Sequence, residues 1–156
     1  SGETVHFVER DGTDAVYIDK VEAFNNGMQM VSRIGSRIPL YCSGVGKAMM
    51  ARMEDWEAEE IWNTSDICAL TEHTITDHEE FKKELAQIRQ QGYALDNEEN
   101  QIGVRCIACS LKVPMGDTKY AFSISAPVSR MDDGRIRELA DYVLGTAKEM
   151  AENLAR

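Results

Sequence analysis

The sequence predicts a single α+β domain, residues 1–156, built on a mainly antiparallel sheet flanked by helices. Its 156 residues, 43% hydrophobic and 28% charged, are enough for one buried core. Strand-like segments separated by turn residues occupy the beginning and the middle of the chain, and an apolar stripe at helical spacing occupies its end. Each expected element follows from one of these local patterns.

The N-terminal third favours three strands, at residues 4–9, 15–22 and 28–34. Turn-like residues at 11–14 and 25–27 separate them, so we expect a meander.

A loop at residues 37–40 then leads to small residues at 43–46, followed by helices at residues 47–52 and 54–62. The next helix has the firmest local pattern. Thr76 and Glu79 have the spacing of a capping box, and Gly92 is expected to end the helix. Its apolar face comprises Phe81, Leu85 and Ile88.

Two further strands, at residues 102–113 and 119–128, are predicted to form a hairpin through the turn at 114–117. The C-terminal segment is expected to be a helix that covers one face of the sheet. Its apolar stripe comprises Ile136, Leu139, Ala140, Val143, Leu144, Ala147, Met150, Ala151 and Leu154.

Composition excludes several function classes. The formal charge of −10, without a local cluster of Lys or Arg, would repel a phosphate backbone, so this segment is not expected to bind nucleic acid. Neither a membrane span nor an export signal is apparent, and we expect a cytoplasmic protein with reduced thiols. The first residue is Ser1, followed closely by a strand, which indicates a piece of a longer protein.

The run from Gly44 to Lys47 lacks the first glycine and the final Ser or Thr of a phosphate-binding loop, so a nucleotide triphosphatase is excluded. Small residues at a helix N-terminus can still offer backbone N–H groups to a carboxylate. An ordinary helix start is the alternative.

Four further patterns have residue types that occur in binding or catalytic sites. Cys106 and Cys109 are three apart on a strand, so their thiols point to opposite faces and should not share a metal. Ser123 and Ser125 share a face that either lines a cavity or meets solvent. The acidic run at residues 96–99 has the composition of a surface turn, and the three histidines lack a catalytic spacing. No metal, cofactor or catalytic residue is therefore expected.

Three stretches together resemble the IclR family of bacterial transcriptional regulators. They lie at residues 37–48, at 92–108 and at 123–127, and the resemblance extends over nearly the whole chain. It implies a GAF-like effector-binding domain that forms homodimers or homotetramers. DNA would be bound only by a winged helix-turn-helix domain that precedes this segment.

The resemblance also implies a site for a small carboxylate effector, of the pyruvate, glyoxylate or sugar-acid kind. The loop amides of Gly44 and Val45 would hold the carboxylate. Polar contacts would come from Asp96, Cys106, Ser123 and Ser125, and Met30 and Ile38 would be apolar wall residues. Ligand binding would change the arrangement of the effector domains and hence the affinity for DNA.

Because a carboxylate repels an anionic ligand, Asp96 is expected to accept a hydrogen bond from a ligand hydroxyl or to be partly protonated. Two alternatives remain. The domain could be an oligomerisation module without a working site, or a hydrolase with Cys106 or Ser123 as nucleophile and His73 as base.

Overall fold

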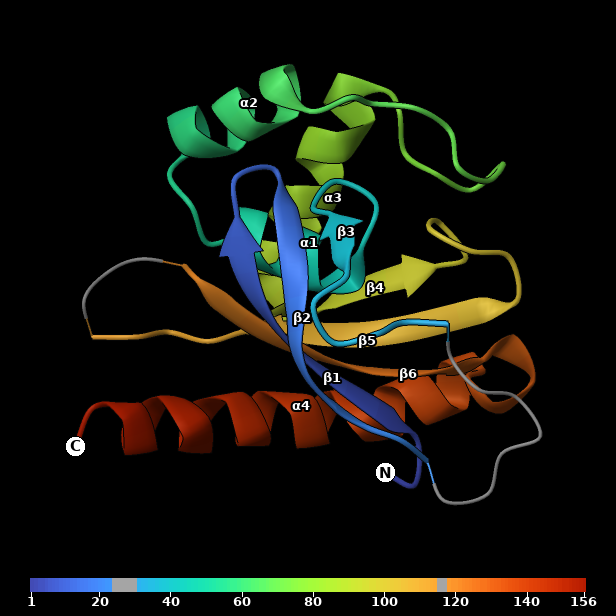
Figure 1. Ribbon diagram of the computed structural model, residues 1–156, viewed down its shortest axis with the longest axis vertical. Helices are drawn as coiled ribbons and strands as arrows, with labels where there is room; N and C mark the ends of the chain where they lie inside the picture. The colour runs from blue at the N-terminus through green and yellow to red at the C-terminus, as the bar shows by residue number, and fades with distance from the viewer. Residues whose placement is uncertain (24–30, 115–117) are drawn as a thin grey trace.

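The computed structural model describes residues 1–23, 31–114 and 118–156. One six-stranded sheet carries helices on both of its faces (Figure 1). Helices α1, α2 and α3 lie above the sheet in this view, and α4 runs along the opposite face. The α+β class predicted from the sequence is confirmed.

All neighbouring strands of the sheet are antiparallel, in the order β3-β2-β1-β6-β5-β4. Their bounds are β1 Thr4–Asp11, β2 Asp14–Val21, β3 Arg37–Pro39, β4 Ala94–Asn97, β5 Val104–Ser110 and β6 Tyr120–Pro127. The predicted first strand pair and the β5–β6 pair are confirmed. The pairing of β1 with β6 joins the two ends of the chain at the centre of the sheet.

The strand predicted at residues 28–34 is wrong where the structure describes it. Residues 31–34 form no strand, and residues 28–30 lie outside the described part. The third strand is instead Arg37–Pro39, which the sequence indicated as a loop. A turn at Gly35 (φ 87°), whose N–H donates to the Tyr17 carbonyl at 2.7 Å, redirects the chain first. Pro39 fits there because β3 is an edge strand.

The helices are α1 Gly44–Met50, α2 Asp55–Thr64, α3 His78–Gln91 and α4 Asp133–Leu154, with a short 3-10 turn at Val128–Arg130. The capping box of α3 is wrong by one residue. Asp77 is the N-cap, and its carboxylate accepts the Glu80 N–H at 2.8 Å. The predicted end at Gly92 (φ 90°) is confirmed.

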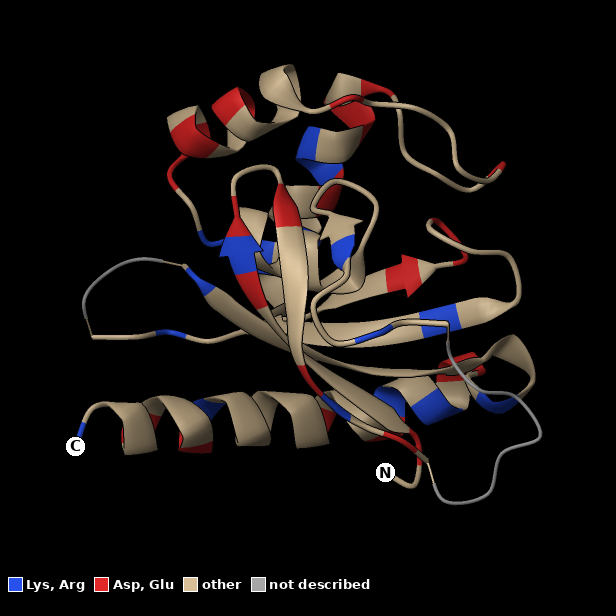
Figure 2. Ribbon diagram, viewed as in Figure 1, with Lys and Arg blue, Asp and Glu red and all other residues tan. Residues whose placement is uncertain are grey.

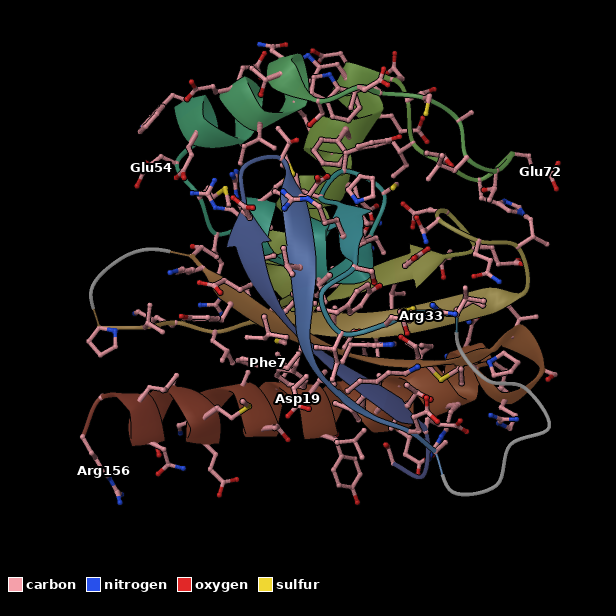
Figure 3. The ribbon with its side chains drawn as sticks, in the orientation of Figure 1. Phe7, Asp19, Arg33, Glu54, Glu72 and Arg156 are labelled. Atoms are coloured by element: carbon pink, nitrogen blue, oxygen red, sulfur yellow. The ribbon has the colours of Figure 1, made fainter. Side chains whose placement is uncertain are left out.

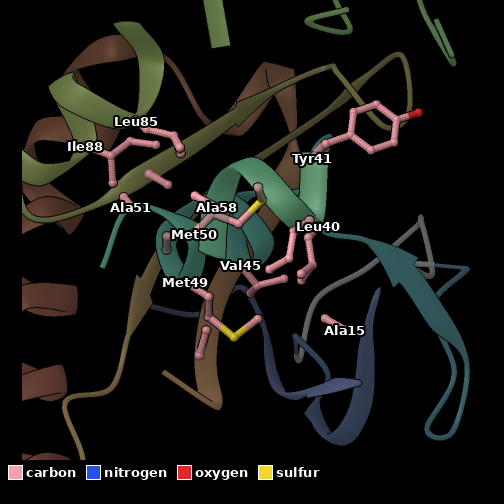
Figure 4. Close-up of a cluster of buried hydrophobic side chains, with 14 of the residues drawn as sticks. Ala15, Leu40, Tyr41, Val45, Met49, Met50, Ala51, Ala58, Leu85 and Ile88 are labelled. Carbon is pink, nitrogen blue, oxygen red and sulfur yellow. The ribbon is translucent and has the colours of Figure 1, made fainter. Parts of the chain in front are cut away.

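The sheet separates two apolar clusters. The upper cluster gathers around α1, where Val45, Met49 and Met50 meet side chains of α2 and α3 (Figure 4). The lower cluster packs the apolar stripe of α4 on β5 and β6, as predicted. Because α1 lies directly on the sheet and beneath α3, every residue of this helix is buried.

Candidate functional site

A row of polar side chains crosses the upper face of the sheet. In the strand register, Asp96 of β4 lies opposite Cys106 of β5, Cys106 opposite Ser125 of β6, and Ser125 opposite Thr4 of β1. Cross-strand partners project from the same face, so these four groups lie side by side. Residues that are far apart in the sequence therefore form one polar surface, which we call the floor: Asp96, Cys106, Ser125 and Thr4.

This floor faces a cavity of about 260 Å³. Asp96, Cys106 and Ser125 contribute to its lining, and the segment at residues 31–36, which carries the labelled Arg33, runs past the same part of the sheet (Figure 3). The remaining lining residues are His6, Tyr17, Val31, Ser32, Ser36, Arg37, Ile38, Pro39, Asn100, Gln101 and Val104. Neutral hydroxyl, amide and imidazole groups outnumber the charged groups.

His6 connects the floor to this segment. Its Nδ1 lies 3.3 Å from Ser125 Oγ, and its Nε2 lies 2.6 Å from Ser32 Oγ. The ring also packs against Tyr17, with centroids 4.9 Å apart. Burial, helped by the nearby Lys20 ammonium, lowers the pKa of His6 to about 4, so its imidazole is neutral at physiological pH.

Asp96 is the carboxyl group of the floor and is almost fully buried. Its Oδ1 accepts the Glu99 N–H at 2.8 Å, which fixes the loop after β4. Burial and the neighbouring Glu99 carboxylate raise the pKa of Asp96 to about 7, although the Glu99 N–H and the Lys47 ammonium oppose the rise. Asp96 is therefore available in both protonation states near neutral pH.

The loop after β4 is also tied to a buried lysine. Lys47 of α1 is fully buried, and its Nζ lies 2.8 and 2.9 Å from the Glu99 carboxylate oxygens and 3.0 Å from Glu84 Oε1. Burial alone would lower the pKa of Lys47, but the two carboxylates outweigh it and raise the pKa. This ion-pair cluster joins α1, α3 and the loop that carries Asn100 and Gln101.

The structure places the sequence-predicted residues in three groups. Ile38, Asp96, Cys106 and Ser125 line the cavity. Gly44, Val45 and Ser123 are buried nearby: a methyl group built on Gly44 would lie 3.7 Å from Asp96 Cβ, and Ser123 is opposite His6 in the register of β1 and β6. Met30 lies outside the described residues.

Sequence reasoning missed several lining residues, notably His6, Tyr17 and Ser32. The alternation of β1 and β2 places His6 and Tyr17 on strand faces but does not tell which face meets a cavity. The interpretation of the acidic run at 96–99 as a surface turn is wrong for Asp96 and Glu99. Asp96 lies in β4 instead, and both Asp96 and Glu99 are buried because Lys47 and backbone N–H groups satisfy them.

The predicted separation of the two central cysteines is confirmed. Cys106 lies on the cavity side, whereas Cys109 belongs to the lower cluster with α4. Burial and the Asp96 carboxylate raise the pKa of Cys106 well above its usual range, so its thiol is a poor nucleophile. His73, the other half of the hydrolase alternative, pairs with Glu72 and Glu98 on an exposed loop.

A second hollow, of about 470 Å³, lies between α2 and α3. Its aromatic lining includes Trp56 and Trp62, and its charged groups pair with each other, as in Glu59 with His78 at 2.9 Å. The sheet cavity, by contrast, gathers groups from all six strands around uncharged polar atoms. The sheet cavity is therefore the better candidate for a small polar ligand.

Two buried titratable groups of the cavity, His6 and Asp96, should have opposite effects on the stability of the fold. His6 has a lowered pKa, so it destabilises the fold as pH falls from 6.5 to 4, by about 3 kcal/mol at most. Asp96 has a raised pKa, so the native state binds its proton more tightly than the unfolded state does. The resulting stabilisation of the fold is complete below pH 3.8 and is lost as pH rises through 7. Between pH 4 and 6.5 the two contributions largely cancel.

Single substitutions should separate the two contributions. Asp96→Asn protein should lose stability on acidification from pH 6.5 to 4, and His6→Phe protein should gain it over the same range. Urea unfolding at several pH values measures both slopes. Equal slopes in the two variants would contradict the assignment.

The family model described as "Bacterial transcriptional regulator IclR C-terminal" matches residues 1–152. The transcriptional repressor IclR of Escherichia coli strain K12 is 35% identical over 152 residues, which cover 96% of this chain and 55% of that protein. The chain thus spans about half the length of this curated relative.

Solved structures agree with this match. The IclR protein of Thermotoga maritima superposes with a TM-score of 0.94 at 36% identity, over 99% of this chain and 62% of that one. A double mutant of the inducer-binding domain of PobR from Acinetobacter, solved in complex with 3-hydroxybenzoic acid, has the same fold (TM-score 0.83, 24% identity), with 100% of this chain and 89% of that chain covered. Within the described residues, no helix is long and apolar enough to cross a membrane.

Proposed function

Because the chain belongs to the IclR family of bacterial transcriptional regulators and corresponds to their C-terminal domain, we propose that its sheet cavity binds a small organic acid as an effector. The ligand would be a pyruvate-like, glyoxylate-like or sugar acid. No bond of the ligand would be made or broken.

The observation that carries this proposal is the row of Asp96, Cys106 and Ser125 across three adjacent strands, on the wall of a cavity of about 260 Å³. A few polar groups that converge on one hollow are typical of small-molecule sites. A double mutant of the PobR inducer-binding domain, which shares the fold, was solved with 3-hydroxybenzoic acid, and this supports an acid ligand here. The amides of Gly44 and Val45 would add donors for the carboxylate.

The bound ligand would act by favouring one arrangement of effector domains in a homodimer or homotetramer, in the cytoplasm. DNA would be bound by another segment of a longer protein. Lys and Arg are spread over several elements of this domain (Figure 2), and the net charge of −10 disfavours direct contact with nucleic acid.

Thermal unfolding with pyruvate, glyoxylate, gluconate or 3-hydroxybenzoate tests the proposal, with pyruvamide as the uncharged control. A ligand present at about 100 times its Kd should raise the Tm by about 5–10 °C, because it binds only the native state. An oligomerisation module without a site predicts no rise with any acid. A hydrolase predicts turnover of an ester probe, which we expect to be absent.

The affinity for an acid ligand should depend on pH through the protonation of Asp96. Protonated Asp96 can donate a hydrogen bond to a ligand carboxylate, whereas ionised Asp96 repels it. The Kd for pyruvate should therefore rise by up to about tenfold per pH unit above pH 7, where the competent form becomes scarce. In Asp96→Asn protein the Kd should be nearly constant from pH 6 to 8, as titration calorimetry can measure. An equally steep rise in that variant would contradict this role.

A further inference from the structure

His6 contacts a serine hydroxyl through each of its two ring nitrogens, one on either side of the cavity. On one side its Nδ1 meets Ser125, whose neighbours on the floor are Cys106 and Thr4. On the other side its Nε2 meets Ser32, at the short distance of 2.6 Å. One ring thus joins the floor of the cavity to the segment at 31–36.

A neutral imidazole has one N–H donor and one bare nitrogen acceptor. The two serine hydroxyls must therefore play opposite parts: one accepts from the ring and the other donates to it. When Nδ1 carries the proton, Ser125 accepts from His6 and keeps its own hydrogen for another partner. When Nε2 carries the proton, the Ser125 hydroxyl donates to Nδ1 and can only accept hydrogen bonds from other groups.

The surroundings of His6 keep the ring neutral and in place. Tyr17 packs on one side of the imidazole, and His6 is only 3% exposed. Lys20 donates from Nζ to the Ser32 carbonyl oxygen at 2.9 Å, so the second serine is held independently of the ring. A nearby ammonium also disfavours a second positive charge.

We propose that His6 is a specificity-determining residue of the cavity, which sets whether the Ser125 hydroxyl donates to the ligand or accepts from it and links that choice to Ser32. This inference rests on the proposed function, because it assigns a role toward the same ligand. A ligand oxygen that needs a donor, such as a carboxylate or keto oxygen, favours the form protonated on Nδ1. A ligand hydroxyl aimed at Ser125 favours the form protonated on Nε2.

Two consequences follow. Acids that differ only in the oxygen at C2 should be distinguished through His6. The direction of the hydrogen bond between His6 Nε2 and the Ser32 hydroxyl should also change with the ligand. The hydrogen bonding of the segment at 31–36 would then depend on which kind of ligand oxygen contacts Ser125. Ser32 is therefore the residue of the segment at 31–36 whose hydrogen bonding would respond directly to the bound ligand.

The experiment compares Kd values for pyruvate and L-lactate, which differ at that oxygen, in unaltered, His6→Phe and His6→Gln protein. His73→Phe is the matched control, because His73 lies on an exposed loop. The ratio of the two Kd values should change by at least about fivefold in both His6 variants and should stay constant in the control. An unchanged ratio in the His6 variants would overturn the inference.

Nitrogen-15 NMR of the imidazole gives a reading that a merely structural role would not move. In unaltered protein saturated with pyruvate, Nδ1 should be the protonated nitrogen, and Ser32→Ala should perturb the Nε2 signal. A proton on Nε2 in the pyruvate complex would also overturn the inference. If neither acid nor any other carboxylate binds unaltered protein, the proposed function itself fails, which is a different result from binding with an unchanged ratio.

Discussion

Replacing Lys47 by methionine is expected to destabilise the domain by about 3–5 kcal/mol, the usual cost of removing one partner from a buried ion pair. Lys47 is fully buried, and the Glu99 carboxylate that it holds is itself only 4% exposed. Methionine fills much of the volume but leaves Glu99 and Glu84 without their cation. Chemical unfolding at pH 7 measures the loss.

Two variants sharpen this prediction. Lys82→Met removes a half-exposed lysine that lies 3.3 Å from Glu79, and it should cost less than about 1 kcal/mol. Lys47→Met combined with Glu99→Gln should be more stable than Lys47→Met alone, because no unpaired charge is left at that position. If the double variant were the less stable of the two, the ion pair would not be the cause.

Replacing Gly46 by alanine is expected to cost about 3 kcal/mol or more, at the upper end of the range for overpacking. A methyl group built on Gly46 lies 2.5 Å from the carbonyl carbon of Leu40, and closer still to its Cα and oxygen. These are backbone atoms, so no side-chain rotation relieves the overlap. Helix α1, which begins with Gly44 and Val45, would have to move away from the loop that precedes it.

Gly145→Ala is the matched control for this substitution. Gly145 lies within α4, and nothing stands within 4 Å of a methyl group built there. Alanine should therefore stabilise α4 by up to about 1 kcal/mol through helix propensity. Opposite signs for the two glycines in thermal unfolding are the expected result, and equal losses would contradict the packing argument.

Local patterns predicted the fold well where one face of an element is buried. The apolar stripe of α4 requires one orientation of the helix toward the sheet, and its packing against β5 and β6 is confirmed. Prediction failed at β3, a three-residue edge strand whose pairing with β2 depends on the turn at Gly35. Such a short strand has too few residues to show a period.

The candidate site was partly accessible from the sequence. The family resemblance named Ile38, Asp96, Cys106 and Ser125, which the structure brings to one cavity. It could not reveal the His6 contacts, because they join residues that are 26 and 119 positions apart. The burial of Asp96 was equally hidden, since an acidic run looks solvated until its buried partner, Lys47, is placed beside it.

Mapping the binding of pyruvate or another stabilising acid by NMR tests the central claim most directly. With the acid near saturation, the largest shifts of backbone amide and side-chain signals should fall on Ile38, Cys106 and Ser125 around the sheet cavity. The indole signals of Trp56 and Trp62, in the hollow between α2 and α3, should stay unchanged. Shifts confined to those indoles, or no shifts with any acid, would contradict an organic-acid site on the sheet.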